Sequence, residues 1–326
     1  MMKTLSSCII ALVILIGHLS SFSEDFGDFQ SRELQCRIGN NTSIDEHRAG
    51  YNGIFCLTSI HQPQTLFVPA YAGLNLEHVF HSALEIENRE ALFEPRLAPM
   101  AFRRVDDRTA ELLQPPTPLT KVESYTTFRL RDPYYIDVEF RCVPTQDVFA
   151  EGTFGLFWAS YINAPHDKSI YFVQGGSSSD RPMWQQFCTQ YHNHDSTVVF
   201  EQDSFHWNFP PSLSDRSLFS SLSQVKYALP FYYGRVRNMV WIILFADPTG
   251  IRFSHSPSGG GRTAKGDDSN PAWDFQFVVP DAAVGKEYST TFRAVYKLWE
   301  SRDDVLNEYR CYQEFLTSNS KDAGKE

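Results

Sequence analysis

The ten residues from Trp273 to Ala282 hold the pattern with the clearest chemical meaning. Asp274 and Gln276 alternate there with the apolar Trp273, Phe275 and Phe277. A strand with this alternation buries one face and holds a carboxylate and an amide together on the other. Such a carboxylate is able to take a proton from a bound molecule. The alternative is a solvated strand face without a catalytic role.

Histidines supply the second kind of proton-transfer group. His78, His166 and His192 are the candidates to act beside Asp274, because imidazole changes its protonation near neutral pH. Asp274 would be the base, and His166 or His192 the acid. A hydrogen-bonded structural histidine is the alternative at each position. Spacing alone does not bring three or four metal ligands together, so the sequence predicts neither a metal nor another cofactor.

Arginine beside tyrosine suits a sugar that carries a carboxylate. An arginine fork binds a uronate carboxylate at two points, and a neighbouring aromatic ring stacks on the sugar. The segments 231–238 and 251–257 combine these residue types. The predicted substrate-binding residues are His81, Tyr233, Arg235, Arg252, His255 and Gln276.

Three segments resemble the galactose mutarotase (aldose 1-epimerase) family, in the order that the family has them. In the late strand of the family, an acidic residue, one spacer and Gln precede Pro-Asp-Ala; residues 274–282 match, with Asp in place of Glu and one extra residue before the proline. Residues 73–81 resemble a Gly- and Asn-rich stretch that brings a histidine to the cleft floor. Residues 160–172 resemble the place where Asn and the general-acid His precede Tyr-Phe, here at a longer interval.

The resemblance implies a fold and a class of ligand. We expect an all-β chain, a large antiparallel β-supersandwich of the galactose mutarotase-like kind, which binds a sugar or uronate on its concave sheet face. An epimerase with a His/carboxylate pair is one expectation. A polysaccharide lyase or a glycosidase is another, although a glycosidase needs two carboxylates across one cleft and nothing pairs Asp274 with Glu77, Glu139 or Glu201. A non-catalytic carbohydrate-binding envelope protein is the third.

Two-residue alternation supports this fold class independently. Residues 122–130 and 135–142 alternate on either side of Asp132-Pro133 and predict a hairpin, while 239–246 are apolar throughout and predict a central strand covered on both faces. Helical spacing with a Ser301/Asp304 cap predicts a helix over 301–317. Further strands are expected at 53–59, 65–70, 90–95, 100–104, 108–113, 154–161, 169–174, 196–200, 250–254 and 288–297.

The ends of the chain and its composition suggest where it acts. Residues 1–23 have a lysine followed by an apolar run too short to span a bilayer, which is typical of an export signal. We therefore expect a secreted or periplasmic protein without a stable membrane anchor. A polar arm at 24–50, one β-domain at 51–317 and a flexible tail at 318–326 would follow. The net charge of −10 without clustered Lys and Arg argues against a nucleic-acid partner.

Five cysteines remain after the expected cleavage. In an oxidising compartment Cys36 and Cys56 are candidates for a disulfide that ties the arm to the first strand. The odd number leaves at least one thiol unpaired.

Overall fold

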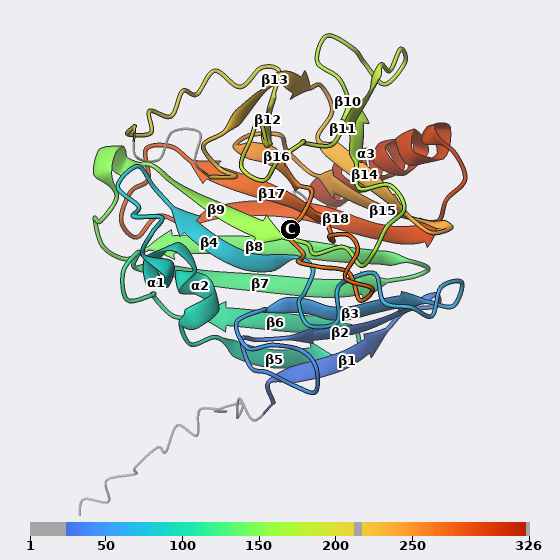
Figure 1. Cartoon of the computed structure of the whole chain (residues 1–326), viewed down its shortest axis with the longest axis horizontal. Coiled ribbons are helices and arrows are strands. Elements are labelled where there is room, and N and C mark those ends of the chain that lie inside the picture. Colours follow the sequence, from blue (N-terminus) through green and yellow to red (C-terminus); the bar gives the residue numbers. More distant parts are fainter. Residues whose placement is uncertain (1–23, 212–216, 324–326) are drawn as a thin grey trace, which may run out of the picture.

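The computed structural model describes residues 24–211 and 217–323 (Figure 1). The expected export signal lies outside these residues. The described strands form three sheets, and they are antiparallel except for one parallel pair, β12 with β13. The smallest sheet contains β1 (Phe26–Gln30), β2 (Leu34–Gly39) and β3 (Gly53–Ser59).

The two larger sheets are the body of the molecule. The nine-stranded sheet has, in spatial order, β11 (Trp184–Phe187), β10 (Ile170–Val173), β14 (Phe231–Val236), β15 (Met239–Phe245), β18 (Tyr288–Leu298), β8 (Tyr135–Pro144), β7 (Val122–Arg131), β6 (Thr109–Gln114) and β5 (Ala101–Asp106). The six-stranded sheet has β13 (Leu222–Tyr227), β12 (Thr197–Phe200), β16 (Ile251–Ser256), β17 (Ala272–Val279), β9 (Phe154–Ala159) and β4 (Asn75–Phe80).

The hydrophobic core lies between these two sheets. Trp273, Phe275 and Phe277 of β17 point into it, as their alternation predicts. Phe275 stacks on Trp158 of β9 with ring centroids 5.0 Å apart, and it meets Phe292 of β18, in the opposite sheet, at the same distance. Each such side chain contributes about 1.5–3 kcal/mol through its removal from water. The other face of β17 is therefore free to carry polar groups.

The expected fold class is confirmed: the chain is mainly antiparallel β-structure with a helix at its C-terminal end. The predicted hairpin is β7 paired with β8, and the predicted central strand is β15, fully buried between β14 and β18. The helix α3 (Arg302–Ala323) packs its apolar side on β14, β15 and β18 (Figure 1). It continues beyond the expected residue 317 because no glycine or proline occurs before Gly324.

The segment expected as a polar arm instead forms β1 and β2. Phe29, Leu34, Cys36 and Ile38 are buried in the main core, so this small sheet closes one end of the sandwich. The alternation in 34–38 is short and lies between the charged pair 32–33 and the polar run 39–43, so the sequence does not predict this strand.

Two other expected strands are wrong. Residues 90–95 form the short helices α1 (Arg89–Leu92) and α2 (Glu94–Leu97), because Asn88 caps the first and Pro95 stands in the first turn of the second. Residues 65–70 are irregular, and Pro69 has no amide proton to give to a sheet. The remaining short helix is a 3-10 turn, Ala150–Gly152.

The expected disulfide is not formed. Cys36 is paired across the sheet with Leu57, and Cys56 with Arg37. A shift of one residue sends two side chains to opposite faces of a sheet, so Cys36 points into the core and Cys56 to the outer face. Both are free thiols in the structure.

Candidate functional site

An irregularity in β4 builds the first part of the site. Leu76 is paired with Trp158 and His78 with Phe157, so Glu77 is an extra residue without a partner in β9. Such a β-bulge redirects side chains, and bulges are frequent next to active sites. Here it turns both Glu77 and His78 toward the face of the six-stranded sheet that lies away from the core.

Glu77 is held firmly by two neighbours. Its Oε1 accepts hydrogen bonds from Tyr161 Oη at 2.6 Å and from Arg96 Nη1 at 2.9 Å. The side chains of Glu77 and Arg96 are only 8% and 14% exposed, and the Arg96 guanidinium lies 3.7 Å from the centre of the Tyr51 ring. Burial and the negative charge of Glu77 raise the pKa of Tyr161 well above its usual value. Tyr161 therefore stays protonated at neutral pH and is a hydrogen-bond donor to Glu77.

Asp274 lies on β17, two strands away from Glu77 in the same sheet. Its Oδ1 accepts a hydrogen bond from the Ser160 backbone N–H at 2.9 Å. Within the part of the chain that the structure describes, its Oδ2 has no hydrogen-bond partner, although the atom is buried. Burial, followed by the repulsion of Glu77, raises the pKa of Asp274 well above the usual value, against the lowering effect of the Ser160 hydrogen bond. A carboxylate in these surroundings is a stronger base than one in water.

His78 and His192 complete the set of proton-transfer groups. His78 Nδ1 donates to the Leu92 carbonyl at 2.5 Å, which leaves Nε2 3.5 Å from Glu77 Oε2. His192 contacts Ser256 Oγ through Nδ1 at 2.6 Å and is exposed to solvent at the surface. Surrounding protein atoms that displace water lower the pKa of both imidazoles, that of His192 although part of its side chain reaches solvent, while the charge of Glu77 raises it.

These side chains line one cleft of about 380 Å³, which is within the usual range for small-molecule sites. Aromatic rings, which suit the apolar face of a sugar, form part of its wall: Tyr51, Phe93 and Phe219. The polar groups in it include Glu77, His78, Arg96, Tyr161, His192 and Asp274, with Glu87, Arg89, Asn193 and Ser217 also in the lining. Three of the four predicted catalytic residues therefore meet, and His166 does not.

The other predicted residues on the six-stranded sheet lie outside the cleft. Gln276 shares a face with Asp274 but donates to Thr197 Oγ1 and Ser254 Oγ. Arg252 is buried with its guanidinium 3.6 Å from Asp203. His255 points the opposite way, because it is paired with Trp273, and its Nε2 donates to the Lys168 carbonyl at 2.8 Å. Burial lowers the pKa of His255 to about 4, so it is a neutral structural histidine.

The remaining predicted residues are elsewhere for topological reasons. Tyr233 and Arg235 belong to β14 of the other sheet; Tyr233 packs under α3, and Arg235 lies over the Trp299 ring. His166 is exposed in the loop after β9. His81 follows β4 and packs against Phe149, and burial lowers its pKa.

Arg96 and Tyr161 were missed by sequence reasoning, and Glu77 was noticed there without a partner. Neither the bulge nor the approach of α2 to β4 has a local signature in the sequence. The one indication of this site in the sequence is an acidic residue next to a histidine, Glu77 and His78.

The pH dependence of stability tests the state of Asp274. Because this pKa is raised, the folded protein binds the Asp274 proton more tightly than the unfolded chain does. The protonated carboxyl therefore contributes fully to stability below the unfolded pKa, and this contribution is lost as the pH rises toward the folded pKa. We expect Asp274→Asn to melt higher than the wild type at neutral pH, by about 2–4 °C for each kcal/mol regained. The difference should vanish near pH 4, roughly the unfolded pKa of Asp. Calorimetry at several pH values measures it, and a difference that does not change with pH would contradict a raised pKa.

The described residues contain neither a metal-binding cluster nor a membrane-spanning helix. Within 24–211 and 217–323, no three His, Cys, Asp or Glu side chains are grouped so that they are able to hold a metal ion. None of the helices in the same part of the chain has the length and apolar character needed to cross a membrane.

Comparison with known proteins gives matches in structure only. No family model matches the chain, and no curated protein matches it in sequence. A putative aldose 1-epimerase from Escherichia coli K12 is similar at a TM-score of 0.47 and 11% identity, over 84% of this chain and 99% of that one. A GalM/aldose epimerase homologue from C. elegans is similar at 0.46 and 9%, over 84% and 99%.

A third similar structure is a heparan sulfate lyase HepC mutant from Pedobacter heparinus, at a TM-score of 0.44 and 11% identity, over 86% of this chain and 36% of that one. At TM-scores below 0.5 we assign no function from these proteins, and any functional proposal has to rest on the cleft residues. The similar solved structures thus include proteins of the family that the three sequence segments resemble.

Proposed function

We propose that this chain is a carbohydrate-active protein that holds a sugar ring in the Asp274 cleft and exchanges protons with the oxygens of the ring. One observation carries the proposal: Asp274 lines the cleft with a buried Oδ2 that has no hydrogen-bond partner among the described residues. An unpartnered polar atom in a buried place is costly, and a sugar hydroxyl would satisfy it. We also infer from residues 1–23 that the protein is exported.

The arrangement suits the exchange of anomers of a free sugar. Ionised Asp274 takes the proton of the anomeric hydroxyl, and the electrons of that O–H bond form the C1 carbonyl. The bond between C1 and the ring oxygen breaks, and the ring oxygen takes the Nε2 proton of protonated His192. Rotation about C1–C2 and reversal of these steps close the ring with the opposite configuration and restore both groups.

The Glu77 network orients the substrate in this scheme. Arg96 and Tyr161 fix the Glu77 carboxylate, so its second oxygen and His78 present a rigid polar wall to the hydroxyls of the sugar. Groups that are already held in place lose little entropy when they bind a ligand.

A polysaccharide lyase is the second candidate. The observation in its favour is that an arginine, a tyrosine and a histidine, Arg96, Tyr161 and His78, share the cleft. It is second because Arg96 is already neutralised by Glu77, and because the two arginines expected to bind a uronate, Arg235 and Arg252, lie elsewhere.

Two assays separate the possibilities. Exchange NMR on free aldoses measures anomer interconversion, and ultraviolet absorbance on uronate polymers detects the unsaturated product of a lyase. Catalysed exchange supports the proposal. Absorbance without exchange identifies the second candidate. Silence in both assays with sugar binding at the cleft would show a non-catalytic binding protein, and absence of any binding would refute a carbohydrate function.

His192→Gln tests the acid. We expect the rate to fall by about 10²-fold, the usual size of an acid–base contribution. In the wild type the rate should rise with pH as Asp274 ionises and fall as His192 loses its proton. The variant should lose the falling limb. The matched control is His194→Gln, because His194 is exposed in the same loop, does not line the cleft and lies beside Asp195, at 3.4 Å, and Tyr191; an equal loss in this control would count against the assignment.

A further inference from the structure

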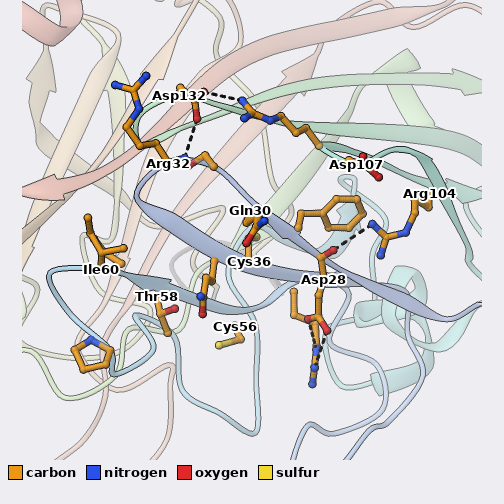
Figure 2. Close-up of a pocket in the computed structure, with 17 residues that line it drawn as sticks. Asp28, Gln30, Arg32, Cys36, Cys56, Thr58, Ile60, Arg104, Asp107 and Asp132 are labelled. Carbon is orange, nitrogen blue, oxygen red and sulfur yellow. Dashed lines mark hydrogen bonds and ion pairs between the residues drawn. The ribbon is translucent and has the colours of Figure 1, made fainter.

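A second cavity lies on the outer face of the small N-terminal sheet (Figure 2). Its volume is about 1250 Å³, and none of the residues that line it lines the Asp274 cleft. Figure 2 shows Asp132, Arg32, Asp107 and Arg104 along its upper side, and Thr58 and Ile60 at the lower left. The lining residues come from β1, β2, β3, β5 and the turns between strands, so parts that are distant in sequence form the walls.

The cavity is rich in cations for so acidic a chain. Four arginines line it against three aspartates, whereas the whole chain has a net charge of −10. Arg37 forms two hydrogen bonds with the Asp28 carboxylate, at 2.8 and 3.0 Å. Arg108 pairs with Asp132 at 3.0 Å. The side chains of the other two arginines, Arg32 and Arg104, form no ion pair with a carboxylate among the described residues, although the Arg32 backbone N–H donates to Asp132 Oδ1 at 2.7 Å.

Arg104 is held in position without being neutralised. Its Nη1 donates to the Asp28 backbone carbonyl at 3.1 Å, and its guanidinium lies 4.4 Å from the centre of the Phe29 ring. Arg32 is exposed at the turn after β1. A guanidinium without a carboxylate is a ready partner for the carboxylate or sulfate of a ligand.

The sheet places two rows of side chains across this cavity. Cross-strand pairing sets Gln30 opposite Gln35, and Gln35 opposite Thr58. The same pairing sets Asp28 opposite Arg37 in the next row. The first row offers neutral amide and hydroxyl groups, which are able to donate and accept hydrogen bonds with sugar hydroxyls. The second row and the turns carry the charges.

We propose that this cavity is a second binding site, for an acidic oligosaccharide that carries carboxylate or sulfate groups at intervals. The neutral row pairs with hydroxyls, and Arg32 and Arg104 pair with the separated anionic groups. Asp28, Asp107 and Asp132 in the same walls repel a ligand with a charge at every unit, such as a nucleic acid. The site would hold a polysaccharide to the protein independently of the Asp274 cleft.

Isothermal titration with purified probes tests the site. The probes are a short oligogalacturonate, a chondroitin sulfate oligosaccharide, a neutral cello-oligosaccharide and a polyglutamate peptide. We expect the two acidic sugars to bind, the neutral one to bind far more weakly, and affinity to fall as salt rises. Preference between the acidic sugars separates carboxylate from sulfate recognition. Arg32→Gln with Arg104→Gln should weaken binding at least about tenfold, because a hydrogen bond to a charged group is strong.

Controls make each outcome decisive. Arg103→Gln removes a neighbouring arginine of β5 that lines a different pocket and pairs with Glu111, and it should bind as the wild type does. Asp274→Asn should also leave this binding unchanged, so failure of the cleft proposal does not affect this one. Because Arg104 packs on Phe29, the exposed Arg32→Gln alone tests the site without a packing change. No binding at low salt, equal loss in Arg103→Gln, or equal binding of polyglutamate would overturn the proposal.

Discussion

Replacement of Asp274 by asparagine should lower the rate of anomer exchange by about 10²-fold or more. The amide has the same shape and still accepts the hydrogen bond from the Ser160 N–H through its oxygen. It is unable to take a proton. Affinity for the sugar should therefore change little, and the loss should appear in turnover. Exchange NMR, with affinity measured separately by titration, gives both quantities.

The control for this change is Asp281→Asn. Asp281 follows the same strand, is exposed, and has a φ of 50° that asparagine also tolerates. The same chemical change outside the cleft should leave turnover intact. A folded Asp274→Asn protein with full activity would show that Asp274 is only a structural acceptor. A variant that melts far below the wild type would contradict the stabilisation expected at neutral pH.

Replacement of Arg96 by methionine should have the largest effect on stability, a loss of about 3–5 kcal/mol in the free energy of unfolding. The change removes the cation that pairs with Glu77 and leaves a carboxylate that is 8% exposed, with Tyr161 and His78 beside it. Methionine keeps an apolar stem against Tyr51, so the loss reports on the charge and on the hydrogen bond that Arg96 Nε donates to the Gly50 carbonyl at 2.7 Å. Denaturant unfolding measures it.

Two variants separate this effect from a general loss of an arginine. Arg103→Met breaks the ion pair with Glu111, in which the Arg103 and Glu111 side chains are 48% and 31% exposed. This change should lower the free energy of unfolding by no more than about 1 kcal/mol. The double variant Glu77→Gln/Arg96→Met removes both charges and should recover part of the stability. If the double variant is as unstable as the sum of its single changes, the two side chains are not coupled and the network described above is wrong.

Alternation in the sequence determined the fold class and the strand that carries the site. In 273–279 every second side chain is large and apolar, and burial of that face in the core leaves Asp274 on the other face. The hairpin of β7 and β8 and the buried β15 follow from the same rule, because side chains of a strand point to its two faces in turn. A period of two residues is a local property, and the sequence shows it directly.

Convergence of the cleft residues was decided by the tertiary structure. Glu77 and His78 face the same way only because β4 bulges against β9, and Arg96 reaches them from a helix where a strand was expected. Tyr233, Arg235 and Arg252 lie in similar segments of arginine and aromatic residues, yet Tyr233 and Arg235 belong to the nine-stranded sheet and Arg252 to the six-stranded one. Pairing between distant strands fixes which faces meet, and no spacing along the chain encodes that pairing, since one residue of slip reverses every side chain.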